Sequence, residues 1–385
     1  MTDLRPADLT PTNLMTAASD KTGLSEFGDD WFVEPLGVLT KSLDQEARLS
    51  DLGRDLTRKR LIGLLVDRLR LRAFQREHPE VRDVEVDVAA AICGLPRTGS
   101  TLLHRLLASS PQLTATLSWE TTYPLPFPGE GPDAEIRKRR ARERILLFKE
   151  LSPEFSDIHD VVWDGPEEDV ILVDRSFTSM SFDSFYWVPS YGEWLRAADQ
   201  GRAYAELREW LQVLQWQDPS RAGRRWVLKS PHHLSALESV LDTFDGCKIV
   251  MTHRTPTSAV PSYASMVRNI SSQYSDAVEP VAIGRYWSDM FVRSLTRFAE
   301  VRAARPERFV DVLFDQMTTE PAARARGVLA EVGVAPGPDD DAAIKAYVEK
   351  DRRERHASHT YAVEDFGLST AQLEREFAFY TEEYL

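Results

Sequence analysis

One segment of the chain combines glycines, hydroxyls and an arginine in a pattern that could bind phosphate or sulfate. Residues 94–101 read GLPRTGST and are followed by the amphipathic stretch LLHRLLASS. A glycine-bearing turn between a strand and a helix directs several backbone N–H groups and a positive helix end toward one point. Ser100 and Thr101 would add hydroxyl donors, and Arg97 would add a permanent positive charge. The segment therefore predicts an anion-binding loop rather than an ordinary tight turn.

The same loop argues against ordinary ATP hydrolysis. Gly94 and Gly99 have the spacing of the first half of a nucleotide-binding P-loop, but Ser100 stands where that motif requires lysine. The run VILVDRS, which contains Asp174, imitates a Walker B strand and is better explained as a buried helix or strand. No Cys/His cluster has metal-ligand spacing, so we predict a site without a metal.

The elements that would hold these residues follow from the hydrophobic pattern. Before residue 80, leucines recur at helical spacing until His78-Pro79 ends the pattern, which predicts an N-terminal helical extension over residues 1–80. After it, short apolar runs alternate with amphipathic segments, which predicts an α/β domain over residues 81–385 with a parallel, P-loop-like sheet flanked by helices. The expected strands are 86–93, 225–229, 248–253 and 309–314. Ligands of such sheets bind beyond the carboxyl ends of the strands, where three of these four runs meet the chemical motifs.

Several segments of the chain resemble PAPS-dependent sulfotransferases, where PAPS is 3′-phosphoadenosine 5′-phosphosulfate. GLPRTGSTLLHRLL resembles the phosphosulfate loop of the bacterial branch, in which a P-R-[ST]-G-[ST]-T core replaces the P-K-S-G-T-T-W form of animal enzymes. The stretch from WVLKSPHH to HRTPTSAVPSYASM resembles the second family signature, and HASHTYAVEDFGLSTAQLEREFAFY resembles the C-terminal tail. The resemblance runs from about residue 85 to the end, and the N-terminal helices are similar to that branch too.

The resemblance implies a sulfotransferase that uses PAPS as its donor and needs no metal. The residues expected to bind the 5′-phosphosulfate are Arg97, Thr98, Gly99, Ser100, Thr101 and Leu102. Arg254 and Ser262 would hold the 3′-phosphate, which distinguishes PAPS from ATP and from adenosine phosphosulfate. The family's usual Arg-Asp-Pro is replaced by Arg254-Thr255-Pro256, and Thr255 can still make a local hydrogen bond before the proline.

The chemistry asks for electrostatic clamping and for a base. Arg97 does not deprotonate and would act as a clamp, whereas Lys229 could reach the bridging oxygen; Lys229 could equally form a strand-end salt bridge. The candidate bases for the acceptor hydroxyl are Glu120 and His233, with Glu120 slightly ahead because an aromatic stretch surrounds it. We expect His104, His232 and His253 to be packed or supporting residues.

The composition limits the partners of the protein. The net charge of −14 argues against nucleic acids and polyanions and favours a small, neutral, apolar acceptor such as a phenol, sterol or lipid alcohol. No stretch of eighteen apolar residues and no leader is visible, and Cys93 and Cys247 suit reduced core thiols, so we expect a cytoplasmic protein without a membrane span. A homo-oligomer is compatible with the sequence. Aromatic residues that could line an acceptor pocket, although most suit a plain core, are Trp119, Tyr123, Phe127, Phe182, Phe185, Tyr186, Trp187, Tyr191 and Trp194.

Some alternatives remain open at the level of sequence. The chain could be a P-loop kinase-like phosphotransferase, which the missing lysine disfavours, or a non-catalytic adenosine-bisphosphate-binding protein. The basic segment 137–144 suits a solvated helix face. The identity of the acceptor and the role of the basic stretch from Arg352 to His359 do not follow from the sequence.

Overall fold

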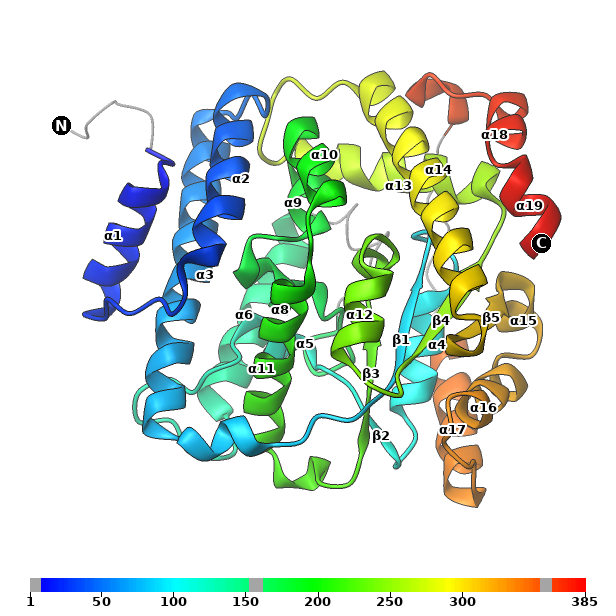
Figure 1. Ribbon diagram of the computed structural model, residues 1–385, viewed down its shortest axis with the longest axis horizontal. Coiled ribbons are helices and arrows are strands. Elements are labelled where there is room, and N and C mark those ends of the chain that lie inside the picture. The colour runs from blue at the N-terminus through cyan, green and yellow to red at the C-terminus, as the bar shows by residue number, and fades with distance from the viewer. Residues whose placement is uncertain (1–7, 152–161, 354–361) are drawn as a thin grey trace.

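The computed structural model describes residues 8–151, 162–353 and 362–385, and it forms a five-stranded sheet with helices on both faces (Figure 1). All strand pairs are parallel, in the order β2-β3-β1-β4-β5. This confirms the α/β prediction. The strands are β1 (Val88–Gly94), β2 (Leu113–Thr114), β3 (Arg225–Lys229), β4 (Lys248–His253) and β5 (Phe309–Leu313).

The four expected strands exist within two residues of their predicted ends, because each is a short, continuously apolar run. Every residue of β1 is buried, as the central position of that strand requires. The two-residue β2 was not predicted. It pairs with β3 through Leu113 and Thr114, which are too few to give a strand signal in the sequence.

Two hydrophobic clusters cover the two faces of the sheet. On one face, Ile92, Val227 and Val250 pack with α4 and α16. On the other face, Ala91 and Cys93 pack beneath the long helices that include α11 and α13. The alternation of side chains along β1 therefore divides its apolar residues between the two layers.

The N-terminal helices lie beside α9, α10 and α11 at one side of the molecule (Figure 1). They comprise α1 (Pro11–Thr22), α2 (Val33–Gln45) and α3 (Asp51–Glu77), with short 3₁₀ turns at Asp30–Phe32 and Pro79–Asp83. Ser50 caps α3 by accepting a hydrogen bond from the Gly53 backbone N–H at 3.0 Å. A Cβ atom on Gly53 would lie 1.9 Å from the Tyr274 carbonyl oxygen, so only glycine permits this close approach. The predicted end of the helical pattern at His78-Pro79 agrees with the end of α3.

The remaining helices follow the strands in chain order. They are α4 (Ser100–Ala108), α5 (Ser118–Thr122), α6 (Glu135–Leu151), α8 (Val170–Val173), α9 (Met180–Phe185), α10 (Pro189–Ala197), α11 (Gly201–Gln217), α12 (Leu237–Thr243), α13 (Pro256–Ser271), α14 (Pro280–Ala304), α15 (Phe314–Thr319), α16 (Pro321–Glu331), α17 (Pro338–Arg353), α18 (Thr370–Glu376) and α19 (Ala378–Tyr384). Short 3₁₀ turns lie at Asp174–Ser176, Pro219–Arg221, Pro231–Ser235, Pro306–Arg308 and Val363–Phe366.

The N-terminal leucines belong to the same hydrophobic cluster as α11 and α13. A division of the chain near residue 80 therefore stays a prediction. Of the basic C-terminal stretch, Arg352 lies exposed at the end of α17, and Arg355, His356 and His359 lie outside the described residues.

Candidate active site

The glycine loop leaves β1 and enters α4 through two residues with left-handed backbone. Arg97 has φ 70° and Gly99 has φ 84°, and α4 begins at Ser100. Gly94 permits β1 to approach β4, since a Cβ atom there would lie 2.4 Å from the Thr252 carbonyl oxygen. The first N–H groups of α4 have no partner within their own helix, so the loop and the helix end together form a cradle for an anion.

The Thr98 side chain is turned into the protein. Its hydroxyl donates to the Leu95 carbonyl oxygen at 2.7 Å and shares a 2.6 Å hydrogen bond with the Thr252 hydroxyl. These bonds fasten the loop to β4. Any contact of Thr98 with a ligand would therefore come from its backbone N–H.

Three strand ends bring their charged residues to this loop. Lys229, at the end of β3, donates from Nζ to the Thr101 hydroxyl at 3.1 Å and forms an ion pair with Glu168. Arg254, directly after β4, donates from Nη1 to the Arg97 carbonyl oxygen at 2.7 Å. Its guanidinium also lies 4.1 Å from the centre of the Phe314 ring, at the end of β5. The carboxyl edge of the sheet thus gathers residues that are up to 157 positions apart.

The other residues expected to bind the donor lie on the adjoining helices. Leu102 is half-buried in the first turn of α4. Ser262 is buried in the second turn of α13, the helix that starts two residues after Arg254. The described contacts include none between Ser262 and the loop.

Glu120 has a different environment from the one its sequence position suggested. Its carboxylate accepts the Leu117 backbone N–H at 2.9 Å, so it caps the short helix α5. Both carboxylate oxygens also accept from Arg221 Nη2 at 2.7 Å, and both side chains are buried. The expected acceptor-facing carboxylate is instead engaged in a buried ion pair.

His233 is fully buried between two partners. Its Nδ1 shares a 2.7 Å hydrogen bond with the Tyr204 hydroxyl, and its Nε2 lies 3.2 Å from Asp169 Oδ2. Asp169 also accepts the Lys229 backbone N–H at 2.8 Å. Burial raises the pKa of Asp169, but the His233 charge and these hydrogen bonds outweigh it and hold that pKa below its usual range. His233 therefore helps to anchor the end of β3.

Glu168 is a site residue that the sequence reasoning missed. It follows Pro166 in the acidic run Glu167-Glu168-Asp169, and it contacts Lys229 Nζ while its side chain remains one-fifth exposed. A run of three carboxylates directly before the apolar VILV segment was the signal that could have identified it. The segment alone would have favoured a solvated turn.

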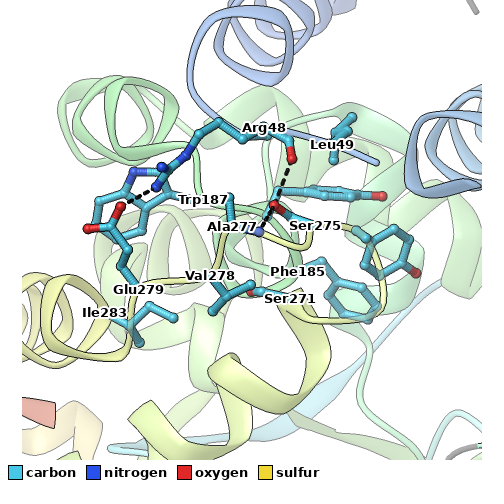
Figure 2. Close-up of a pocket in the computed structure, with 13 residues that line it drawn as sticks. Arg48, Leu49, Phe185, Trp187, Ser271, Ser275, Ala277, Val278, Glu279 and Ile283 are labelled. Carbon is cyan, nitrogen blue, oxygen red and sulfur yellow. Dashed lines mark hydrogen bonds and ion pairs between the residues drawn. The ribbon is translucent and has the colours of Figure 1, made fainter. Parts of the chain in front are cut away.

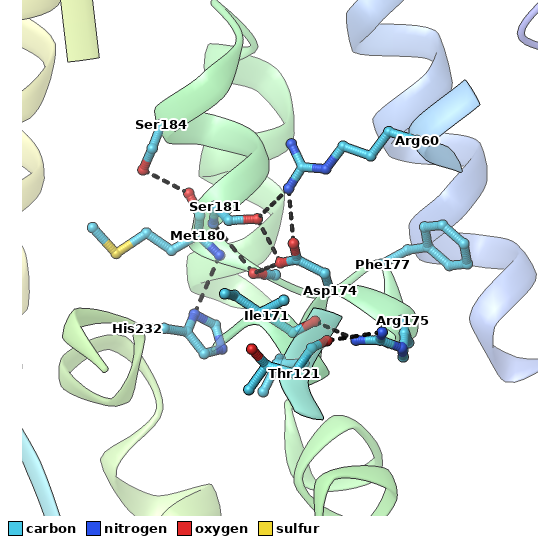
Figure 3. A network of polar contacts seen from close by, with 12 residues as sticks. Arg60, Thr121, Ile171, Asp174, Arg175, Phe177, Met180, Ser181, Ser184 and His232 are labelled. Carbon is cyan, nitrogen blue, oxygen red and sulfur yellow. Dashed lines mark hydrogen bonds and ion pairs between the residues drawn. The ribbon is translucent and has the colours of Figure 1, made fainter. Parts of the chain in front are cut away.

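The remaining histidines are packed, as expected. His104 is buried, and that burial, with the Lys229 charge, lowers its pKa to about 4. His232 accepts the Met180 backbone N–H at 3.3 Å, and its burial, with the His233 charge, lowers its pKa to about 3 (Figure 3). His253 lies between the Tyr380 hydroxyl at 2.7 Å and Asp311 at 2.9 Å.

The segment that imitates a Walker B strand is helical. Asp174 follows α8 and accepts from Arg60 Nη2 at 2.7 Å and from the Ser179 hydroxyl at 2.7 Å, as Figure 3 shows. It therefore joins α3 to the start of α9. No group of three or more potential metal ligands occurs within residues 8–151, 162–353 and 362–385.

The aromatic residues expected near an acceptor divide into two groups. Phe182, Tyr186 and Tyr191 are buried, which confirms a core position for these three. The others, Trp119, Tyr123, Phe127, Phe185, Trp187 and Trp194, are partly exposed. A small cavity of about 20 Å³ lies beside Phe185 and Trp187 under the Arg48–Glu279 ion pair (Figure 2). That cavity can hold about one water molecule and no aromatic acceptor.

The fold and the loop agree with comparisons to known proteins. The sequence profile of the Sulfotransferase family matches residues 90–338, and the chain belongs to this family. Sulfotransferase STF1 from Mycobacterium tuberculosis H37Rv is 29% identical, with a TM-score of 0.86, over 97% of this chain and 100% of that one. Sulfotransferase STF9 from Mycobacterium avium has the same fold, at 24% identity and a TM-score of 0.85, over 99% of this chain and 98% of that one. A search of curated proteins found no match.

Two further observations bear on the environment of the protein. Neither Cys93 nor Cys247 is paired, and burial raises the pKa of both thiols. Among the helices of the described ranges, none combines the length and the apolar character that a bilayer crossing needs.

Proposed function

We propose that this transferase moves a sulfuryl group from PAPS to a hydroxyl of a small, apolar acceptor such as a phenol, sterol or lipid alcohol. One observation carries the proposal: Arg97, Thr101, Lys229 and Arg254 meet at the carboxyl edge of the sheet, with Lys229 3.1 Å from Thr101 and Arg254 2.7 Å from the Arg97 carbonyl. A donor with two anionic ends suits two separate clusters of positive charge.

In this proposal the loop binds the 5′-phosphosulfate. Backbone N–H groups from Thr98 to Leu102 and the hydroxyls of Ser100 and Thr101 would donate to its oxygens. Arg97 would clamp the same group through its permanent charge. Lys229 would contact the bridging oxygen, because its ammonium already contacts the hydroxyl of Thr101. Sulfuryl transfer resembles phosphoryl transfer in depending on alignment and charge stabilisation, and these residues supply both.

The 3′-phosphate would bind Arg254 and Ser262. Arg254 lies on the outer side of the loop and is held by Phe314 and by the Arg97 carbonyl. This contact would join recognition of the 3′-phosphate to the shape of the 5′ cradle.

The neutral, apolar acceptor is supported by charge and by the aromatic residues. A protein with a net charge of −14 repels polyanionic acceptors and nucleic acids. Partly exposed rings such as Phe185 and Trp187 are suited to binding an apolar body. The unpaired thiols of Cys93 and Cys247 suit a reducing compartment, which supports a cytoplasmic location.

A two-part experiment tests the proposal against its alternatives. Adenosine 3′,5′-bisphosphate should raise the melting temperature much more than ATP with magnesium does, since stabilisation follows RT ln(1 + [L]/Kd). PAPS labelled with ³⁵S should then label acceptors in a pool of phenols, sterols and lipid alcohols. Equal stabilisation by both nucleotides would favour a kinase. Stabilisation by the bisphosphate without labelling of any acceptor would favour a non-catalytic binding protein.

A further inference from the structure

The proposed reaction, on which this inference rests, requires a base beside the transferring group. The acceptor oxygen must attack the sulfur opposite the bridging oxygen, so its proton has to leave close to the loop. A base must lie within hydrogen-bond reach of that proton. The residues that bracket the transfer point are Thr101 and Lys229, which are in contact with each other.

The two candidate bases from the sequence are engaged elsewhere. Glu120 has both carboxylate oxygens on Arg221 and one of them also on the Leu117 N–H. His233 has Tyr204 on one ring nitrogen and Asp169 on the other. Accepting a proton from a substrate would require either group to give up a buried partner, which is costly.

We infer that Glu168 is the general base, acting as a carboxylate held against Lys229 at the end of β3. Its Oε1 is paired with Lys229 Nζ, and within the described ranges no hydrogen bond to Oε2 occurs. Its side chain is 20% exposed, whereas that of Lys229 is only 4% exposed, so the pair has one side toward solvent. An entering hydroxyl would meet the carboxylate on that side.

The backbone around Glu168 is rigidly held, which suits a catalytic group. The next residue, Asp169, binds the Lys229 N–H at 2.8 Å and His233, so the segment is tied to β3. The Glu168 N–H donates to its neighbour Glu167 at 2.9 Å. The buried His233–Asp169 pair thus acts as support for Glu168, which gives the histidine a positioning role.

The step balances in atoms and charge. The acceptor O–H proton passes to a Glu168 carboxylate oxygen as the acceptor oxygen forms its bond to sulfur. The bond between sulfur and the bridging oxygen breaks, and its electron pair stays on the 5′-phosphate of the leaving adenosine 3′,5′-bisphosphate. Lys229 stabilises that developing charge, and Glu168 later releases its proton to water.

Substituted phenols of graded acidity test this assignment at saturating PAPS. Glu168→Gln keeps the size of the side chain and an oxygen toward Lys229, and it should lower turnover of weakly acidic phenols by about 10² to 10⁴. The loss should shrink as the phenol becomes more acidic, because an ionised acceptor needs no base. Binding of adenosine 3′,5′-bisphosphate, measured by calorimetry, should change little. Asp164→Asn, the same chemical change at an exposed residue of the same loop, should leave turnover unaltered.

The outcomes separate this inference from the proposed function. An equal loss for all phenols, or a parallel loss of bisphosphate binding, would make Glu168 a structural partner of Lys229 and overturn the inference. Normal turnover in Glu168→Gln with a large loss in Glu120→Gln or His233→Asn would return the role to that residue. If the wild-type protein binds the bisphosphate but transfers sulfate to no acceptor, the proposed function fails before the variants are compared.

Discussion

Arg254 has two contacts that could each explain its position after β4. Its guanidinium donates to the Arg97 carbonyl oxygen, which shapes the loop, and it lies over the Phe314 ring, which holds it at the surface of the site. The first contact is structural. The charge that both contacts leave facing outward is the part expected to select a 3′-phosphate.

Arg254→Ala should therefore weaken binding of adenosine 3′,5′-bisphosphate by about 2 to 4 kcal/mol, the scale for removing one partner of a charge-assisted pair. Binding of adenosine 5′-phosphosulfate should be nearly unaffected. Calorimetry of both ligands measures the difference, with Arg268→Ala on the exposed side of α13 as the matched control. Equal weakening of both ligands would mean that Arg254 acts only through the loop.

At the scale of elements, the C-terminal helix α19 holds the end of β4. The Tyr380 hydroxyl bonds His253 Nδ1 at 2.7 Å, and Tyr384 stacks on the same ring with a 9° interplanar angle. On its other side His253 bonds Asp311, which Arg302 of α14 also binds. Because Arg254 follows His253 directly, this cluster supports the base of the expected 3′-phosphate site.

Tyr380→Phe should lower the free energy of unfolding by about 1 to 3 kcal/mol, because it leaves a buried ring nitrogen of His253 without its partner. Urea denaturation measures this change. Tyr384→Phe removes a hydroxyl from the same helix without touching that bond and should cost less. A similar loss in both variants would show that ring packing, and not the hydrogen bond, holds α19 in place.

At the scale of the whole molecule, buried titratable groups should make stability depend on pH. Burial lowers the pKa of His104 to about 4 and of His232 to about 3, from an ordinary value of 6.5. Both histidines are thus neutral in the folded protein where the unfolded chain binds protons. Their contribution is fully present above pH 6.5 and is lost as the pH falls toward these lower values. Asp183 opposes them, since burial raises its pKa to about 7 and its contribution fades as the pH rises through that value.

His104→Gln should therefore flatten the acid side of the stability curve between pH 6.5 and about 4.5. The slope should fall by about 1.4 kcal/mol per pH unit, the equivalent of one proton. Urea midpoints measured across this range give the slope, and His232→Gln provides an independent second case. An unchanged slope in both variants would mean that water reaches these rings and that they titrate normally.

The sequence by itself determined the features that depend on neighbouring residues. The order glycine, arginine, hydroxyls, then an amphipathic run predicted a strand, a loop and a helix, and residues 88–108 have that structure. The four apolar strands and the end of α3 at Glu77 followed from local periodicity in the same way. Such signals survive because backbone hydrogen bonding and burial act over a few residues.

Only the tertiary structure decided which side chains meet. Glu120 and Arg221 are 101 positions apart, and Lys229 and Glu168 are 61 apart, so no spacing along the chain predicts either pair. Each carboxylate had several arginines and lysines available as partners. The choice was made when helices and strands packed, because a buried charge must find a partner within hydrogen-bond distance. For that reason the sequence reached the loop and the sheet edge, and it could not tell that Glu120 would be enclosed while Glu168 stayed beside the lysine.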